Sequence, residues 1–241
     1  MIELESSTEF DLELKKISSL LWKPWVGKEY SLLKGNKLLI VGESHYNHLP
    51  EQSIKESIGG TRSMIHSDGL YGYDKSGKEK HIFLRKTEQV LWSKKDISKK
   101  HRKILWPSVS FYNFIQSRME TKNHRPTKID WQIGWQTFTQ VIEILKPDYV
   151  LFCGVSAFNK RKDLSEAIIK NGFKLSIIKT SNEKVNGTTV KDIFTLTKNG
   201  ETVTMCCMKH PSRACTYWKW SKIIKSHMPE YISWLRAQFL P

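Results

Sequence analysis

The chain has 241 residues, 39% of them hydrophobic, which is enough to bury a substantial core and fits one large domain better than two small ones. Lysine and arginine number 39 against 24 acidic residues, and the formal net charge of +15 makes a polyanion, nucleic acid above all, the natural partner. The sequence has neither the layout of a signal peptide nor the run of about 18 apolar residues that crosses a membrane, so we expect a cytoplasmic protein without a membrane partner.

The first part of the chain predicts a helix, a buried strand and a long irregular stretch. Residues 10–21 carry apolar side chains at helical spacing, and Pro24 ends the pattern. Residues 37–41 form a short apolar run before Gly42, which is typical of a central parallel strand buried on both faces. Residues 48–103 are polar, glycine-dotted and weakly periodic, so they predict a long excursion with a few short helices.

Helices and strands alternate in the rest of the chain. We expect one helix after Pro107 and another over residues 133–145, and further helices end the chain. Strands are predicted at residues 149–153, 175–179, 193–197 and 202–208. The Asn199-Gly200 pair between the last two suits a type I′ hairpin turn. The alternation predicts one α/β domain over residues 1–241, a three-layer α/β/α fold with a short, mainly parallel central sheet of about four strands.

Two basic stretches, residues 78–103 and 209–225, contain aromatic residues among their lysines and arginines. This composition suits nucleic acid, whose phosphates attract cations and whose unpaired bases stack on aromatic rings. The alternative is a generally basic surface whose aromatic side chains turn into the core.

Polar side chains follow two of the predicted strands at the edge where open α/β sheets bind ligands, the carboxyl ends of the strands. Gly42 allows a sharp turn of the backbone, and the side chains of residues 43–47 after it can hydrogen-bond or titrate. His210 follows the last predicted strand, before a turn fixed by proline. A lone histidine or glutamate in a loop is more often solvated than catalytic, but the two segments at one sheet edge together predict a site.

The segments VGESHYN at residues 41–47 and KHPSR at residues 209–213 resemble the first and last motifs of the uracil-DNA glycosylase superfamily. The segments KPDYVLFCGVSAF at residues 146–158 and WPSVSFYNF at residues 106–114 are similar to the parts between those motifs. The resemblance spans residues 37–220 without the long excursion, and HPS after a strand is its most specific part. It implies a short parallel sheet between helices and a base flipped out of DNA into a pocket at the strand ends.

The resemblance also implies hydrolysis of an N-glycosidic bond without a metal, a cofactor or a covalent enzyme intermediate. Negative charge develops on the departing base, and His210 is the candidate donor to its O2 atom, with a structural histidine that caps the turn as the alternative. Ser44 and His45 replace the family's water-orienting aspartate and its proline. Glu43 matches the glutamate of the G-E-x-P-G branch, so we assign water activation to it, with His45 and Asn47 as helpers and a structural role as the alternative. The predicted catalytic residues are Glu43, His210, Ser44 and His45.

The same resemblance implies residues that hold the flipped base and the DNA. Tyr46 would stand against the C5 edge of the pyrimidine, and Phe111 would stack on the base unless its aromatic segment begins a core helix. The predicted substrate-binding residues are Gly42, Tyr46, Asn47, Phe111 and Asn113. Ala214 is too small to replace the family's leucine wedge, which leaves that role to Arg213 or Tyr217, unless the preferred substrate is already open and needs no wedge. The predicted DNA-binding residues are Lys209, Ser212, Arg213 and Tyr217.

No metal site is predicted. His45 and His48 have a zinc-like spacing, but no third and fourth ligands lie at convincing spacing. The four cysteines lack CxxC spacing and fall in the wrong places for the iron-sulfur cluster of the G-E-x-P-G branch, so we expect reduced, buried thiols.

The leading hypothesis is a monomeric, monofunctional DNA glycosylase that acts on double- or single-stranded DNA. It would excise an altered pyrimidine, uracil or a modified cytosine such as those of phage DNA, and leave an abasic site, which in the phage case makes it an antiviral defence enzyme. No lysine is placed as a Schiff-base nucleophile, so no lyase activity is expected. The alternative, which Ser44 favours, is a DNA- or lesion-binding module on the same fold that has lost catalysis. A Rossmann-type nucleotide enzyme ranks last, because GxGxxG and a P-loop lysine are both missing.

Overall fold

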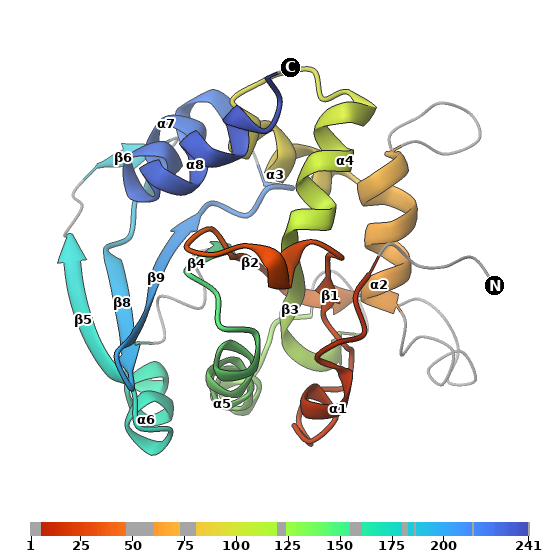
Figure 1. The fold of residues 1–241 in the computed structure, drawn as a ribbon. Helices are drawn as coiled ribbons and strands as arrows, with labels where there is room; N and C mark the ends of the chain where they lie inside the picture. Colours follow the sequence, from red (N-terminus) through yellow and green to blue (C-terminus); the bar gives the residue numbers. More distant parts are fainter. Residues whose placement is uncertain are drawn as a thin grey trace.

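The computed structural model describes residues 6–46, 60–72, 81–119, 124–154, 161–179, 183–185, 187–213 and 215–240. A seven-stranded sheet runs through its centre, with helices on both faces (Figure 1). The mixed α/β fold in three layers agrees with the prediction. Within the described ranges, no helix combines the length and the apolar character that crossing a membrane requires.

The sheet is larger than the four strands predicted, because antiparallel strands extend a parallel centre. The strands are β1 (Trp25–Val26), β2 (Leu38–Tyr46), β3 (Val109–Met119), β4 (Tyr149–Cys153), β5 (Lys174–Lys179), β8 (Ile193–Lys198) and β9 (Glu201–Met208). Their order is β1-β3-β2-β4-β9-β8-β5, and β3, β2, β4 and β9 are parallel. The short strands β6 (Lys184–Val185) and β7 (Thr188–Thr189) form a separate two-stranded sheet.

The predicted hairpin joins β8 to β9. Asn199 and Gly200 have φ values of 52° and 82°, the two left-handed conformations that a type I′ turn needs, and Lys198 pairs with Glu201. The hairpin returns the chain along β4, so that β9 ends beside β4 and just before His210.

The segment after Pro107 is a strand, so the helix predicted there is wrong. Pro107 lies in the last turn of α4 (Lys99–Ser108), and β3 begins at Val109, paired with Leu38 of β2. Its nearly continuous apolar and aromatic residues suit a strand that is buried on both faces, and such a run hides the period that separates a strand from a helix. Phe111 therefore comes from the sheet and not from the start of a helix.

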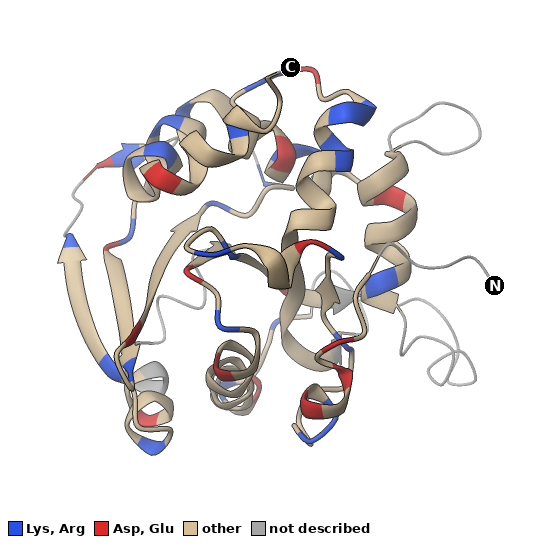
Figure 2. Ribbon diagram, in the orientation of Figure 1, with Lys and Arg blue, Asp and Glu red and all other residues tan. Residues whose placement is uncertain are grey.

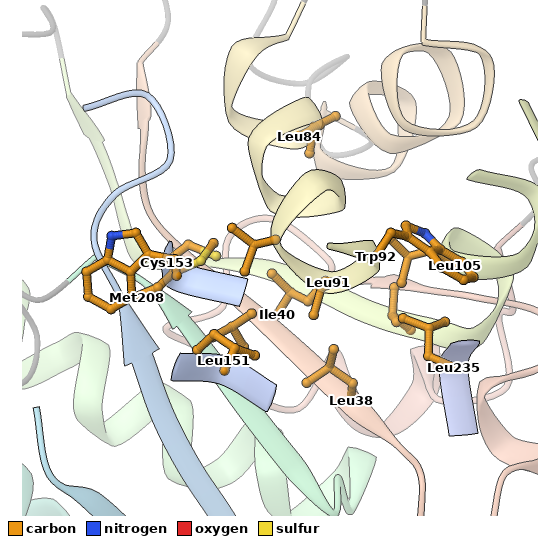
Figure 3. Close-up of a cluster of buried hydrophobic side chains, with 14 of the residues drawn as sticks. Leu38, Ile40, Leu84, Leu91, Trp92, Leu105, Leu151, Cys153, Met208 and Leu235 are labelled. Atoms are coloured by element: carbon orange, nitrogen blue, oxygen red, sulfur yellow. The ribbon is translucent and has the colours of Figure 1, made fainter. Parts of the chain in front are cut away.

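Different helices cover the two faces of the sheet (Figure 1). One face carries α3 (Ile82–Trp92), α4, α7 (Tyr217–His227) and α8 (Pro229–Ala237), and the other carries α1 (Asp11–Leu14), α5 (Lys128–Leu145) and α6 (Arg161–Lys170). The remaining helices are η1 (Tyr30–Leu32), α2 (Gly60–Met64) and the π-helix η4 (Ile65–Tyr71). Because side chains alternate along a strand, Leu38 and Ile40 pack into the α3 layer (Figure 3) and Leu39 and Val41 into the α5 layer.

One expected helix differs from the structure: α1 is a single turn at residues 11–14, not a helix over residues 10–21. The excursion was expected to hold a few short helices, and α3 and the first half of α4 lie in it. Both bury apolar side chains in the core. The lysine-rich connection between them conceals their periodicity in the sequence.

A buried ion pair joins α3 to α4. Arg102 Nε donates to Glu88 Oε2 at 3.1 Å and Trp106 Nε1 donates to Glu88 Oε1 at 2.8 Å. The side chains of Arg102 and Glu88 are 2% and 1% exposed. We expect Glu88→Ala to lower the free energy of unfolding by about 3–5 kcal/mol, because the guanidinium would stay buried without its carboxylate. Urea unfolding followed by circular dichroism measures the loss.

The exposed ion pair of Lys146 and Glu201 provides the control. Its Nζ and Oε1 atoms lie 2.9 Å apart, but the two side chains are 59% and 60% exposed. Glu201→Ala should change the free energy of unfolding by less than about 1 kcal/mol. Similar losses in the two variants would contradict a special contribution from the buried pair.

Candidate active site

Three strand ends bring a carboxylate and an imidazole to the same glycine. Glu43 lies near the end of β2, Gly154 follows β4 and His210 follows β9. A Cβ atom placed on Gly154 would lie 3.2 Å from Glu43 Oε2 and 3.9 Å from His210 Cδ2. Glu43 of the first motif and His210 of the last motif therefore meet at the carboxyl ends of the parallel strands.

His210 is a neutral imidazole at physiological pH. The backbone N–H of Ser212 donates to its Nδ1 atom at 3.3 Å, which leaves Nε2 as the protonated nitrogen of the neutral ring. Burial, and to a smaller extent the positive charges of Arg213 and Arg125, lower the pKa of His210 to about 4. The ring can therefore donate one hydrogen bond through Nε2 without carrying a charge.

Phe83, in the first turn of α3, packs against His210 and was not predicted as a site residue. Its ring centroid lies 5.4 Å from that of His210 and 5.9 Å from that of Phe111. The sequence shows Phe83 only as one aromatic residue in a basic stretch, and nothing local indicates a contact with a residue so far along the chain. The ring shields one side of the imidazole from solvent, which agrees with burial as the main cause of the lowered pKa.

Gly42 leaves room for the side chain of Asn113. The two residues pair across β2 and β3, and a Cβ atom on Gly42 would lie 2.1 Å from Asn113 Oδ1 and 3.2 Å from Phe111 Cζ. Asn113 is 8% exposed. Asn113, Phe111 and Phe83 thus gather beside Gly42 and His210, but all three are buried, and Phe111, at 1% exposed, belongs to the hydrophobic core.

A small cavity lies on the α5 side of the strand ends. Its volume of about 10 Å³ is close to the room that one water molecule needs. The lining residues are Val41, Gly42, Glu43, Phe114, Trp131, Phe152, Cys153 and Gly154. Glu43 supplies a carboxylate to a wall that is otherwise largely aromatic and aliphatic.

Positive charges surround this edge of the sheet. Arg125 and Arg213 are exposed, and both act electrostatically on His210. Burial raises the pKa of Cys215 to about 11, and the charges of Lys86 and Lys209 oppose that shift, which places both lysines nearby. Figure 2 shows further lysine and arginine residues along α7 and α4.

The predicted DNA-binding residues lie on the loop that holds His210 and on the helix after it. Ser212 and Arg213 are exposed, and Lys209 and Tyr217 are half-buried. Lys86 Nζ lies 6.0 Å from the centroid of the Tyr217 ring, so the tyrosine is already in contact with a cation of α3.

The structure places only part of the first motif. Ser44 Oγ is buried and has no hydrogen-bond partner among the described residues. β2 continues through His45 and Tyr46 after a bulge at Ser44, but the side chains of these two residues are outside the described part of the chain. Asn47 and Ala214 also lie outside it.

All four cysteines are free and buried, as predicted. Burial raises the pKa of the Cys206 thiol to about 12 and that of Cys153 still further, so neither forms a thiolate readily. Within the described ranges, no three histidine, cysteine or acidic side chains gather into a possible metal site.

Gly154→Ala should disturb the arrangement of Glu43 and His210. The φ of Gly154 is 151°, a conformation that side chains rarely adopt, and the new methyl group would press on Glu43 Oε2 at 3.2 Å. We expect a loss of about 1–3 kcal/mol in the free energy of unfolding and a shift of the His210 ring resonances in the NMR spectrum.

Gly200→Ala separates backbone strain from this contact. Gly200 has a φ of 82°, and no atom lies within 4 Å of a Cβ placed on it. This variant should lose stability without moving the His210 resonances. Unchanged His210 resonances in Gly154→Ala would contradict the close approach at Gly154.

Comparison with known proteins gives no family for this chain. No protein-family model matches the chain, and no curated protein matches its sequence.

Proposed function

We propose that the chain is a monofunctional DNA glycosylase that flips an altered pyrimidine out of DNA and hydrolyses its N-glycosidic bond. The observation that carries this proposal is the meeting of the Glu43 carboxylate and the His210 imidazole at Gly154. The VGESHYN and KHPSR segments, which resemble motifs of the uracil-DNA glycosylase superfamily, supply these two residues.

His210 stabilises the departing base. As the bond breaks, negative charge moves onto the pyrimidine and its O2 atom becomes a stronger acceptor, so a donor aimed there stabilises the transition state more than the ground state. The Ser212 N–H occupies Nδ1, and Nε2–H is the group that donates. A neutral donor leaves the negative charge on the base until water has added to the sugar.

Glu43 positions and deprotonates the water. Its carboxylate oxygen Oε2 lies beside Gly154, the glycine that His210 also approaches, and the proposed water binds there. The carboxylate accepts a proton as the water oxygen bonds to C1′ and the base departs. Ser44, whose hydroxyl is buried beside this position, and His45 assist.

The base lies between aromatic surfaces and is read by an amide. The residues proposed for this role are Phe83, Phe111 and Asn113. Because their side chains are buried, the base reaches them only when the segment around them opens. As residues of the first motif, Tyr46 and Asn47 are also proposed to contact the base.

The DNA approaches along the positive edge of the sheet. The phosphates around the flipped nucleotide bind to Arg213, Lys209 and Ser212. Tyr217 fills the space that the flipped base leaves in the duplex. The protein acts as a monomer in the cytoplasm, without a metal or cofactor and without lyase activity. The substrates are uracil or a modified cytosine, and modified cytosines of phage DNA would make the protein a defence enzyme.

The test uses end-labelled oligonucleotides, single- and double-stranded, that carry uracil, a 5-substituted cytosine or no altered base, together with phage DNA rich in modified cytosine. Hot alkali then breaks the strand at each abasic site. We expect breaks at one kind of altered base and none in unmodified DNA. No breaks on any substrate would refute the proposal, and retained, salt-sensitive binding would then indicate the non-catalytic DNA-binding module that Ser44 favours.

A further inference from the structure

The exposed face of α7 combines a tryptophan with three lysines. Trp218, Lys219, Lys222 and Lys225 are exposed, and Trp218 retains 58% of its accessible surface. Trp218, Lys222 and Lys225 follow the spacing i, i+4, i+7, which places them on one side of a helix. The helix sequence YWKWSKIIKSH contains no acidic residue, so this stripe is uniformly positive.

Trp218 is set apart from the other tryptophans of the chain. Among the tryptophans that the structure describes, it alone is exposed, and its neighbour Trp220 is 0% exposed in the core. Lys219 Nζ lies 5.2 Å from the centroid of the Trp218 ring, so a cation already borders the indole. Aromatic rings bordered by cations are the usual surface for stacking single-stranded bases.

The stripe begins beside the candidate active site. α7 follows the His210 loop directly, and its first residue, Tyr217, contacts Lys86 of α3. At a rise of about 1.5 Å per residue, the distance from Trp218 to Lys225 is roughly 10 Å.

We propose that this face of α7 binds the single-stranded DNA that flanks the flipped nucleotide, with Trp218 stacked on an unpaired base and Lys222 and Lys225 on its phosphates. The inference rests on the proposed function, which sets the flipped nucleotide at His210. A single strand is required, because only an unpaired base exposes a free ring face to an indole. The uniformly positive stripe fits the phosphates on the same strand.

Fluorescence anisotropy with a labelled, unmodified single-stranded oligonucleotide tests the stripe. We expect Trp218→Ala to weaken binding by about 5- to 100-fold and Trp218→Phe to keep most of the affinity, because phenylalanine retains a ring for stacking. The joint substitution of Lys222 and Lys225 by glutamine should flatten the dependence of the dissociation constant on salt concentration. Ile178→Ala is the matched control, since Ile178 on β5 is also 58% exposed.

The outcomes separate this inference from the proposed function. Equal affinities of the wild type and Trp218→Ala would overturn the inference, and an equal loss on fully paired duplex would overturn the single-strand assignment. If the wild type binds the strand through Trp218 but releases no base from any substrate, the stripe stands and the glycosylase proposal fails. If the wild type releases a base and Trp218→Ala binds the strand normally, the glycosylase proposal stands and the inference about α7 fails.

Discussion

His210→Ala is expected to slow base release by about 100- to 1,000-fold, while the affinity for DNA stays nearly unchanged. The imidazole would donate to an oxygen whose charge grows only as the bond breaks, and removing one such donor costs a factor of this size. Single-turnover kinetics on the substrate found in the alkali assay measure the effect.

His227→Ala is the matched control for His210→Ala. Burial lowers the pKa of His227 to about 4, as it does for His210, but His227 lies at the far end of α7. This variant should keep full activity. A His210→Ala protein with the rate of the wild type would remove His210 from the mechanism.

The low pKa of His210 also sets a dependence on pH. The unfolded chain takes up a proton near pH 6.5, whereas the folded ring resists protonation down to about pH 4. The contribution of His210 to the free energy of unfolding should therefore be constant above about pH 7 and be lost between pH 6.5 and pH 4, and His210→Ala should reduce the fall of stability in that range. The neutral donor should persist in the folded protein from pH 8 down to about pH 5.

Glu43→Gln is expected to slow base release by about 100- to 10,000-fold, the range associated with a positioned general base. Glutamine keeps the shape of the side chain and its contact with Gly154, but it cannot accept the proton of the attacking water. The chemical step measured at saturating enzyme should therefore fall, with little change in the dissociation constant for DNA.

Glu13→Gln is the control for this loss, because Glu13 is exposed in the short helix α1. It removes one negative charge without touching the strand ends, so its rate should equal that of the wild type. Full activity of Glu43→Gln would assign water activation to another group.

The parallel centre of the fold could be predicted, because strands buried on both faces have nearly continuous apolar sequences. Residues 149–153 coincide with β4 and residues 202–208 with most of β9, whereas residues 37–41 include only the first part of β2, which continues to Tyr46. β3 was not predicted as a strand, because its aromatic residues follow Pro107 and were interpreted as the start of a helix. Length and periodicity could not separate the two interpretations, and only pairing with β2 does so.

His210 could be proposed as a site residue because it follows a strand whose end is visible in the sequence. Glu43 was proposed for the same reason, but the turn expected at Gly42 is wrong, because β2 continues through Glu43 to Tyr46. Phe83 could not be proposed, since its contact with His210 depends on how α3 packs against the sheet. The same is true of Arg125, whose charge acts on His210 from the segment before α5. Shifts of pKa arise from such packing, and no spacing within the chain encodes them.

The parallel order of the central strands also affects how the protein folds. Lys37 N donates to Asp148 Oδ2 at 2.7 Å across 111 residues of chain, and β4 must then wait for β9 before it has its second neighbour. The entropy cost of closing such a long loop arises before the strand pairing can stabilise the chain, so such topologies fold slowly. During synthesis Glu43 leaves the ribosome long before His210 exists. The carboxylate and the imidazole can therefore come together only after β9 and the loop behind it have been synthesised.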